Sequence, residues 1–96
     1  MFIVSVTYLQ PLEVVDHHLP AHIGFLDDYF ARGIFIASGR KVPRTGGFIL
    51  AGGVSREEIA AIVEEDPFKR NGVASYEITE FAPSKTAPEF AALIGR

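Results

Sequence analysis

Two short runs of consecutive apolar residues constrain the fold of this chain more than any other feature. They are Ile34-Phe35-Ile36 and Phe48-Ile49-Leu50, and both have the length and composition of β-strands. A sheet with one face in water shows a regular alternation of apolar and polar side chains. Because neither run alternates, we expect a sheet that is covered on both faces. The same sheet of a second subunit is predicted to cover the second face, in a homodimer.

The other patterns predict the order strand, helix, strand, strand, helix, strand. The first helix is expected over residues 14–32, where Pro20 either kinks it or begins its main part, and Gly33 closes it. The second helix opens on a capping box at Ser55. Strands are expected at residues 2–8, 34–37, 48–51 and 75–81, with a loop at 38–47 and a short helix at 89–94. The helical residues expected to face the core are Leu19, Ile23, Leu26 and Phe30, followed by Ile59, Ile62 and Val63.

This order of elements is that of the ferredoxin-like βαββαβ fold. It is an α+β arrangement in which two helices cover one face of a four-stranded antiparallel sheet. The chain of 96 residues is expected to form one domain, residues 1–96. Small domains often gain stability by association, and a hydrophobic content of 48% exceeds what one small core needs. Composition therefore also favours a homo-oligomer.

Charge and composition exclude several classes of function. The net charge is −3 and no basic stripe is present, so nucleic acid is not an expected partner. No apolar run approaches the roughly 18 residues that span a bilayer, and the first residues lack the pattern of a signal peptide. The absence of cysteine excludes disulfides, thiol nucleophiles and cysteine metal sites, and fits a cytoplasmic protein.

The segment Asp66-Pro67-Phe68 carries the strongest signal for chemistry. It follows an amphipathic stretch at residues 55–65, so Asp66 is expected at the C-terminal end of that helix. A helix C-terminus disfavours a carboxylate unless something offsets the charge. A histidine is the natural partner, because the carboxylate fixes its tautomer and raises its basicity. We therefore predict that His22 and Asp66 form a catalytic pair.

Taken together, several segments of the chain resemble the YciI-like family of the dimeric α+β barrel group. They are Pro20-Ala21-His22, Phe25-Leu26, residues 33–39, residues 46–51, Glu64-Glu65-Asp66-Pro67-Phe68 and Gly72-Val73. The resemblance implies a dimeric barrel, and it implies that His22 and Asp66 are the catalytic pair. It further implies elimination or isomerisation without a cofactor, on small oxygenated molecules that are often aromatic or lactone-like. Arg40 stands where many relatives have proline, so we expect the substrate to differ from theirs.

Each of these residues also has a purely structural interpretation. His22 lies beside apolar helix positions and is also consistent with a core histidine, and Asp66 before Pro67 is also a common helix terminator. Phe25, Tyr29 and Phe68 are expected to be core or pocket wall. On these readings the protein would be a non-catalytic dimeric module that binds a small metabolite or supports an assembly.

The segment after the second predicted strand offers candidates for substrate binding. Arg40 and Arg44 are suited to hold a planar anion, with Ser38 as a further polar group, although a solvated loop explains them equally well. His18 and His22 have the i, i+4 spacing of two metal ligands. Pro20 lies between them and no third ligand is evident, so we expect neither a metal nor an organic cofactor.

Overall fold

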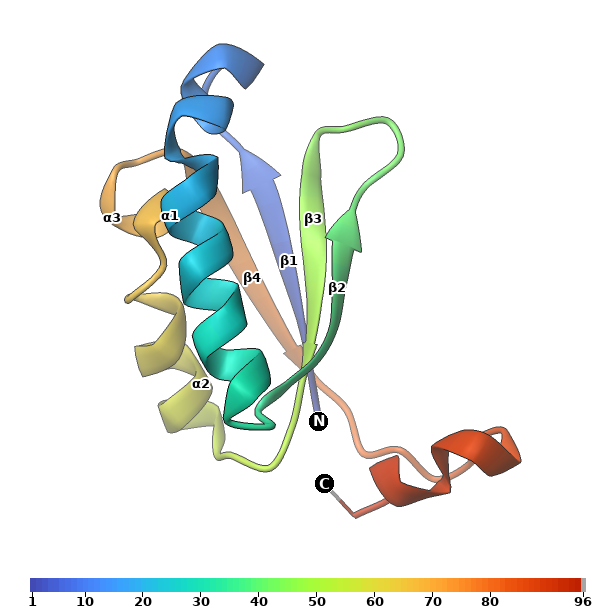
Figure 1. Cartoon of the computed structure of the whole chain (residues 1–96). Helices are drawn as coiled ribbons and strands as arrows, with labels where there is room; N and C mark the ends of the chain where they lie inside the picture. The colour runs from blue at the N-terminus through green and yellow to red at the C-terminus, as the bar shows by residue number, and fades with distance from the viewer. Residues whose placement is uncertain (96) are drawn as a thin grey trace.

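The computed structural model describes residues 1–95 and contains a single sheet flanked by helices (Figure 1). Its elements follow one another along the chain as β1 (Phe2–Tyr8), α1 (Leu12–Ala31), β2 (Phe35–Arg40), β3 (Gly46–Ala51), α2 (Arg56–Val63), α3 (Pro67–Arg70), β4 (Ala74–Glu80) and the 3₁₀ helix η1 (Pro88–Leu93). None of the described helices combines the length and apolar character needed to cross a bilayer.

The sheet has the strand order β2-β3-β1-β4, and every neighbouring pair is antiparallel. Helices α1 and α2 lie on the same face of this sheet, and the opposite face carries no helix (Figure 1). The predicted α+β ferredoxin-like fold is confirmed. The capping box is confirmed too, since the Ser55 side chain accepts from the backbone N–H of Glu58 and the Glu58 carboxylate accepts from that of Ser55.

The core lies between the helices and the sheet, and it corrects the expected face of α1. Val15 and Tyr29 are buried, whereas Ile23 and Phe30 are 46% and 36% exposed. The buried line of α1 therefore runs through Val15 and Tyr29. His22 is seven residues from each of them, so it lies on that same buried line. Consecutive residues on this line are two helical turns apart.

Two apolar runs predicted a sheet covered on both faces. The structure gives a different reason for the missing alternation in each strand. In β3, Ile49 is buried against the helices, whereas Phe48 is 48% exposed on the opposite face, where Leu50 lies opposite Ile3. In β2, a register shift between Phe35 and Ala37 inserts Ile36 as an extra residue. Such a bulge interrupts alternation by itself. The open face of the sheet is defined here by Ile3, Phe48 and Leu50.

Several predicted boundaries are wrong. Helix α1 begins before residue 14, and Pro20 lies inside it rather than at its start. The predicted loop 38–47 is shorter in the structure, residues 41–45, because Ser38 to Arg40 pair with Ile49 to Gly47. Glycine permits this pairing at Gly47, where a Cβ would lie 2.7 Å from the carbonyl oxygen of Gly39. Gly33 follows the C-cap of α1 with φ +74°, as predicted.

The chain after β4 leaves the body of the domain. Figure 1 shows η1 standing away from the sheet and from helices α1 and α2. The short helix predicted at 89–94 is a 3₁₀ helix at Pro88–Leu93, and none of its residues is buried. Phe90 and Ile94 are 54% and 48% exposed.

Candidate active site

His22 and Asp66 lie side by side although 44 residues separate them in sequence. The Nδ1 atom of His22 is 2.8 Å from Oδ1 of Asp66. The histidine comes from the buried line of α1, and the aspartate precedes α3. The side chain of Asp66 is fully buried and that of His22 is 12% exposed. The structure therefore brings together the two residues that the sequence analysis paired.

The position of Asp66 differs from the prediction in one respect. Asp66 does not end α2, which stops at Val63, but is the N-cap of the short helix α3. Its Oδ1 accepts a hydrogen bond of 3.0 Å from the backbone N–H of Phe68. Helix N-termini favour a negative charge, so the carboxylate is stabilised by its own helix. The predicted electrostatic cost at a helix C-terminus was wrong, because Pro67 begins a new helix here.

A third donor reaches Asp66 from the sheet. The hydroxyl of Tyr76, on β4, donates to Oδ2. Burial of this hydroxyl, reinforced by the adjacent carboxylate, raises the pKa of Tyr76 far above its ordinary value. Because a carboxylate only accepts, Nδ1 of His22 carries the hydrogen in the contact with Oδ1. In the neutral ring Nε2 is then unprotonated and able to accept a proton.

Aromatic packing holds the imidazole of His22 in place. Its ring stacks on that of Phe68, with centroids 4.0 Å apart and planes 5° from parallel. Phe25 approaches from the same helix with a centroid distance of 6.3 Å. Phe68 is 1% exposed, and it belongs to the helix that Asp66 caps. The ring and its carboxylate are thus fixed by the same short element.

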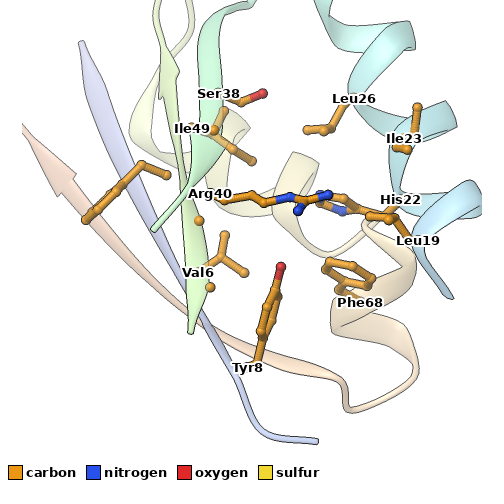
Figure 2. Close-up of a pocket in the computed structure, with 14 residues that line it drawn as sticks. Val6, Tyr8, Leu19, His22, Ile23, Leu26, Ser38, Arg40, Ile49 and Phe68 are labelled. Carbon is orange, nitrogen blue, oxygen red and sulfur yellow. The ribbon is translucent and has the colours of Figure 1, made fainter. Parts of the chain in front are cut away.

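The stacked imidazole borders a cavity of about 190 Å³ between α1 and the sheet (Figure 2). Its lining is mostly apolar, from Leu19, Ile23 and Leu26 on the helix and from Val6 and Ile49 on the sheet. An apolar cavity of about 150 Å³ accommodates benzene. This cavity is therefore of a size for a molecule with one six-membered ring and a few substituents.

Polar groups enter the cavity from the sheet side. Ser38 and Arg40 line it from β2, and Tyr8 lines it from the end of β1 with its hydroxyl directed inward (Figure 2). None of the ion pairs among residues 1–95 involves Arg40. Its guanidinium extends across the cavity toward the side that carries His22 (Figure 2). A cationic fork thus shares one cavity with the unprotonated nitrogen of the histidine.

Arg44, which was predicted beside Arg40, has a different environment. Its Nη2 lies 2.6 Å from Oδ1 of Asp16 on α1, and its guanidinium is 5.8 Å from the ring centre of Tyr8. The Arg44 hydrogen bond holds the pKa of Asp16 below its ordinary value, and Arg40 contributes through its charge. Arg44 is not among the residues that line the cavity. It ties the 41–45 loop to α1 at the edge of the site.

The remaining predicted residues divide between wall and surface. Phe68 is a cavity wall, and Tyr29 is a core residue whose hydroxyl donates to Glu65 over 2.7 Å. His17 and His18 pack edge to face at 5.1 Å. Within residues 1–95, no group of three or more His, Asp or Glu side chains is arranged to hold a metal ion.

Two tyrosines of the site were missed by sequence reasoning. Tyr8 ends a strand whose inward face, Phe2, Val4 and Val6, was evident from alternation. Tyr76 lies opposite Val6 in the register of β1 and β4, on that same inward face. Alternation predicts which face of the sheet each tyrosine side chain lies on. It does not predict which carboxylate the hydroxyl contacts or which cavity it lines.

Comparison with known proteins agrees with this geometry. Residues 1–82 match the YCII-related domain. The chain belongs to this family. The match ends just after β4, so η1 lies beyond the family domain. No curated protein sequence matches the chain.

Among solved structures, the fold of this YCII-related protein is similar to that of a dehydrochlorinase. This protein is 5-chloro-2-hydroxyhydroquinone dehydrochlorinase (TftG) from Burkholderia phenoliruptrix AC1100, in complex with 2,5-dihydroxybenzoquinone. The TM-score is 0.70 at 20% sequence identity, and the match covers 84% of this chain and 93% of that one. At this identity the likeness establishes a common fold.

Proposed function

We propose that the protein is an acid–base enzyme that needs no cofactor and uses His22 to move a proton on a small oxygenated ring compound. The observation that carries this proposal is the 2.8 Å contact of His22 with buried Asp66, beside a cavity that His22 itself lines. A histidine that served only the core would have no reason to border a cavity shared with an arginine lacking an ion-pair partner. The geometry therefore favours an enzyme over a module that only binds a metabolite.

The proposed chemistry begins with proton transfer to Nε2 of His22. The proton comes from a carbon next to a carbonyl group, and the electron pair of the broken C–H bond passes to the carbonyl oxygen. Asp66 stabilises the imidazolium that forms. In an isomerisation, the imidazolium returns the proton to another carbon. In an elimination, the electron pair instead expels a leaving group as an anion, and the imidazolium releases its proton to solvent.

The substrate class follows from the size and lining of the cavity. Its volume and apolar walls suit one six-membered ring, while Ser38, Tyr8 and Arg40 offer donors to ring oxygens. The structural neighbour TftG is named for a chlorinated hydroxyhydroquinone and holds a dihydroxybenzoquinone. We take these points as support for hydroxylated aromatic, quinone-like or lactone-like substrates.

A panel of such compounds tests the proposed function. Hydroxyquinones, their chlorinated forms and small unsaturated lactones are incubated with the protein in the presence of a chelator, and products are followed by absorbance and mass spectrometry. Turnover of at least one compound that is lost in His22→Gln supports the proposal. Turnover that is unchanged in His22→Gln overturns it.

Arg40 is expected to hold the oxygen that becomes negatively charged. We predict that Arg40→Gln lowers kcat/KM by about 10–100-fold, because a hydrogen bond to a charged group is worth ~1.5–3 kcal/mol. Arg44→Gln is the matched control, since it removes a nearby arginine that pairs with Asp16 outside the cavity lining. Steady-state kinetics of both variants decide the point. Equal losses in the two variants would mean that net charge, and not the placement of Arg40, is responsible.

We also propose that the protein is a cytoplasmic homodimer in which the open faces of two sheets pack together. The exposed Ile3 and Phe48 on this face support a partner. We predict a dimer at micromolar concentration in sedimentation velocity. Ile3→Glu should weaken it by about 100-fold, because burying an unpaired charge costs roughly 3 kcal/mol or more.

The control for this dimer prediction is a glutamate at an apolar residue outside the open face. Val42 lies in the 41–45 loop and is 97% exposed, so Val42→Glu should leave the dimer intact. Urea unfolding of both variants separates loss of dimer from loss of fold. A wild-type protein that sediments as a monomer contradicts the proposal.

A further inference from the structure

Asp66 is held by more groups than the proposed proton transfer uses. Its Oδ1 accepts from Nδ1 of His22 and from the backbone N–H of Phe68. Its Oδ2 accepts from the hydroxyl of Tyr76, which is the only described hydrogen bond to that oxygen. The contact with Phe68 is a helix cap, and the contact with His22 belongs to the proposed reaction. The contact with Tyr76 has no assigned role.

We propose that Tyr76 is a positioning residue that sets the tautomer of His22 by fixing the rotation of the Asp66 carboxylate. This inference rests on the proposed function for its kinetic consequence, but its structural part stands apart from any substrate. The two contacts of Oδ1 anchor one corner of the carboxylate. Turning about the Cβ–Cγ bond moves both oxygens, so the contact of Oδ2 with Tyr76 adds a restraint from the sheet to the two restraints on Oδ1.

Tyr76 is suited to act as a permanent donor. It lies on β4, opposite Val6 of β1 in the centre of the sheet, so its backbone position is fixed by antiparallel pairing. Burial and the neighbouring carboxylate raise its pKa, so the hydroxyl keeps its hydrogen throughout the range where enzymes work. A donor that never ionises can orient Asp66 at every pH, but it cannot serve as the acid or base itself.

The expected consequence of losing this hydroxyl concerns the hydrogen on His22. Without Tyr76, Oδ2 becomes a buried acceptor that lacks a partner, which is unfavourable. The carboxylate then reorients, and the Nδ1–H contact competes with other arrangements. Because the hydrogen on one ring nitrogen is set by the partner of the other, the Nε2–H form of His22 becomes populated. In that form Nε2 cannot accept a proton from a substrate.

The structure offers a matched control for the test. Tyr29 is also a buried tyrosine whose hydroxyl donates to a carboxylate, that of Glu65, which is adjacent to Asp66 in sequence. Tyr29→Phe removes the same chemical group from a contact between α1 and the segment that joins α2 to α3, whereas Tyr76 reaches that segment from β4. The Tyr29→Phe change leaves all contacts of Asp66 in place. Any effect of Tyr76→Phe beyond that of Tyr29→Phe reports on Asp66.

The experiment reads the side-chain nitrogens of histidine by ¹⁵N NMR at mildly alkaline pH, in wild type, Tyr76→Phe and Tyr29→Phe. The chain has three histidines, and His22→Gln assigns the signal of His22. We expect the Nδ1–H form to dominate in wild type and in Tyr29→Phe, and a mixture with the Nε2–H form in Tyr76→Phe. Once a substrate is known, kcat of Tyr76→Phe should fall by about tenfold at nearly constant KM, because a tenfold change in rate corresponds to the free energy of about one buried hydrogen bond.

The two proposals fail in different ways. An unchanged His22 tautomer in folded Tyr76→Phe overturns the positioning role, whatever the activity. A shifted tautomer together with full activity of His22→Gln keeps the positioning role and rejects the proposed reaction. If Tyr76→Phe unfolds, Tyr76→Met provides a second side chain without a donor: a mixture with the Nε2–H form supports the proposal, and a folded protein with only the Nδ1–H form overturns it.

Discussion

His22→Gln is expected to lower kcat by about 10²–10⁴-fold, the usual contribution of a general acid–base group. Glutamine fills a similar space and can still hydrogen-bond to Asp66. Its amide, however, is neither a base nor an acid near neutral pH. The stacking of the imidazole on Phe68 is lost, so a modest decrease in stability accompanies the kinetic effect.

Stopped or continuous assays on any substrate found in the panel measure this effect, with urea unfolding to show that the variant is folded. His18→Gln is the matched control, because His18 lies one turn earlier on α1 but is not among the residues that line the cavity. Full activity of His22→Gln would reject the mechanism. Activity that is lost on chelation and restored by zinc would instead support a metal site built on His18 and His22.

Asp66→Asn is expected to affect both rate and stability. The amide has one acceptor oxygen in place of two, and its NH₂ group faces donors from His22, Phe68 and Tyr76. Each buried polar group without a partner costs ~1–3 kcal/mol, so a loss of about 3 kcal/mol in the free energy of unfolding is expected. The matching change behind a catalytic histidine costs roughly 10⁴ in kcat in a Ser-His-Asp enzyme.

Chemical denaturation and steady-state kinetics on the same samples separate these two effects. Asp28→Asn is the control for stability, because Asp28 pairs with Arg32 on the surface, where both side chains are more than half exposed. Exposed pairs of this kind contribute about 0.2–1 kcal/mol. If Asp66→Asn were no more destabilising than Asp28→Asn, the buried network around Asp66 would have little energetic weight.

The sequence predicts the order of elements because that order depends on local patterns, whereas the pairing of His22 with Asp66 was inferred from their complementary chemistry and from the family resemblance. Alternation in residues 2–8, the capping box at Ser55 and the Asp-Pro-Phe segment each report a short stretch of chain. The seven-residue spacing of Val15, His22 and Tyr29 is also a local pattern, but the sequence analysis did not identify it as the buried line of α1. The large apolar residues Ile23 and Phe30 indicated a different face, since hydrophobicity alone does not distinguish a core position from a partly exposed one.

Other features depend on contacts that local patterns cannot encode. Helix α3 has only four residues, too few to show periodicity, so Asp66 was assigned to the end of the preceding helix. Strand β2 extends to Arg40 because Gly47 of β3 permits a close approach to the backbone of Gly39, although glycine usually indicates a loop. The pairing of Arg44 with Asp16 joins a loop to α1 across 28 residues of sequence, and no sequence motif predicts it.

The helix cap formed by Asp66 changes what its motif means for related sequences. Because the carboxylate secures α3 and its Phe68 wall, selection for a folded protein alone is sufficient to retain Asp-Pro-Phe. Relatives that have lost activity are therefore expected to keep the aspartate, while position 22 is free to drift. On the proposed mechanism, we expect the residue equivalent to His22 to distinguish active enzymes from inactive relatives, and the more recognisable Asp-Pro-Phe segment not to do so.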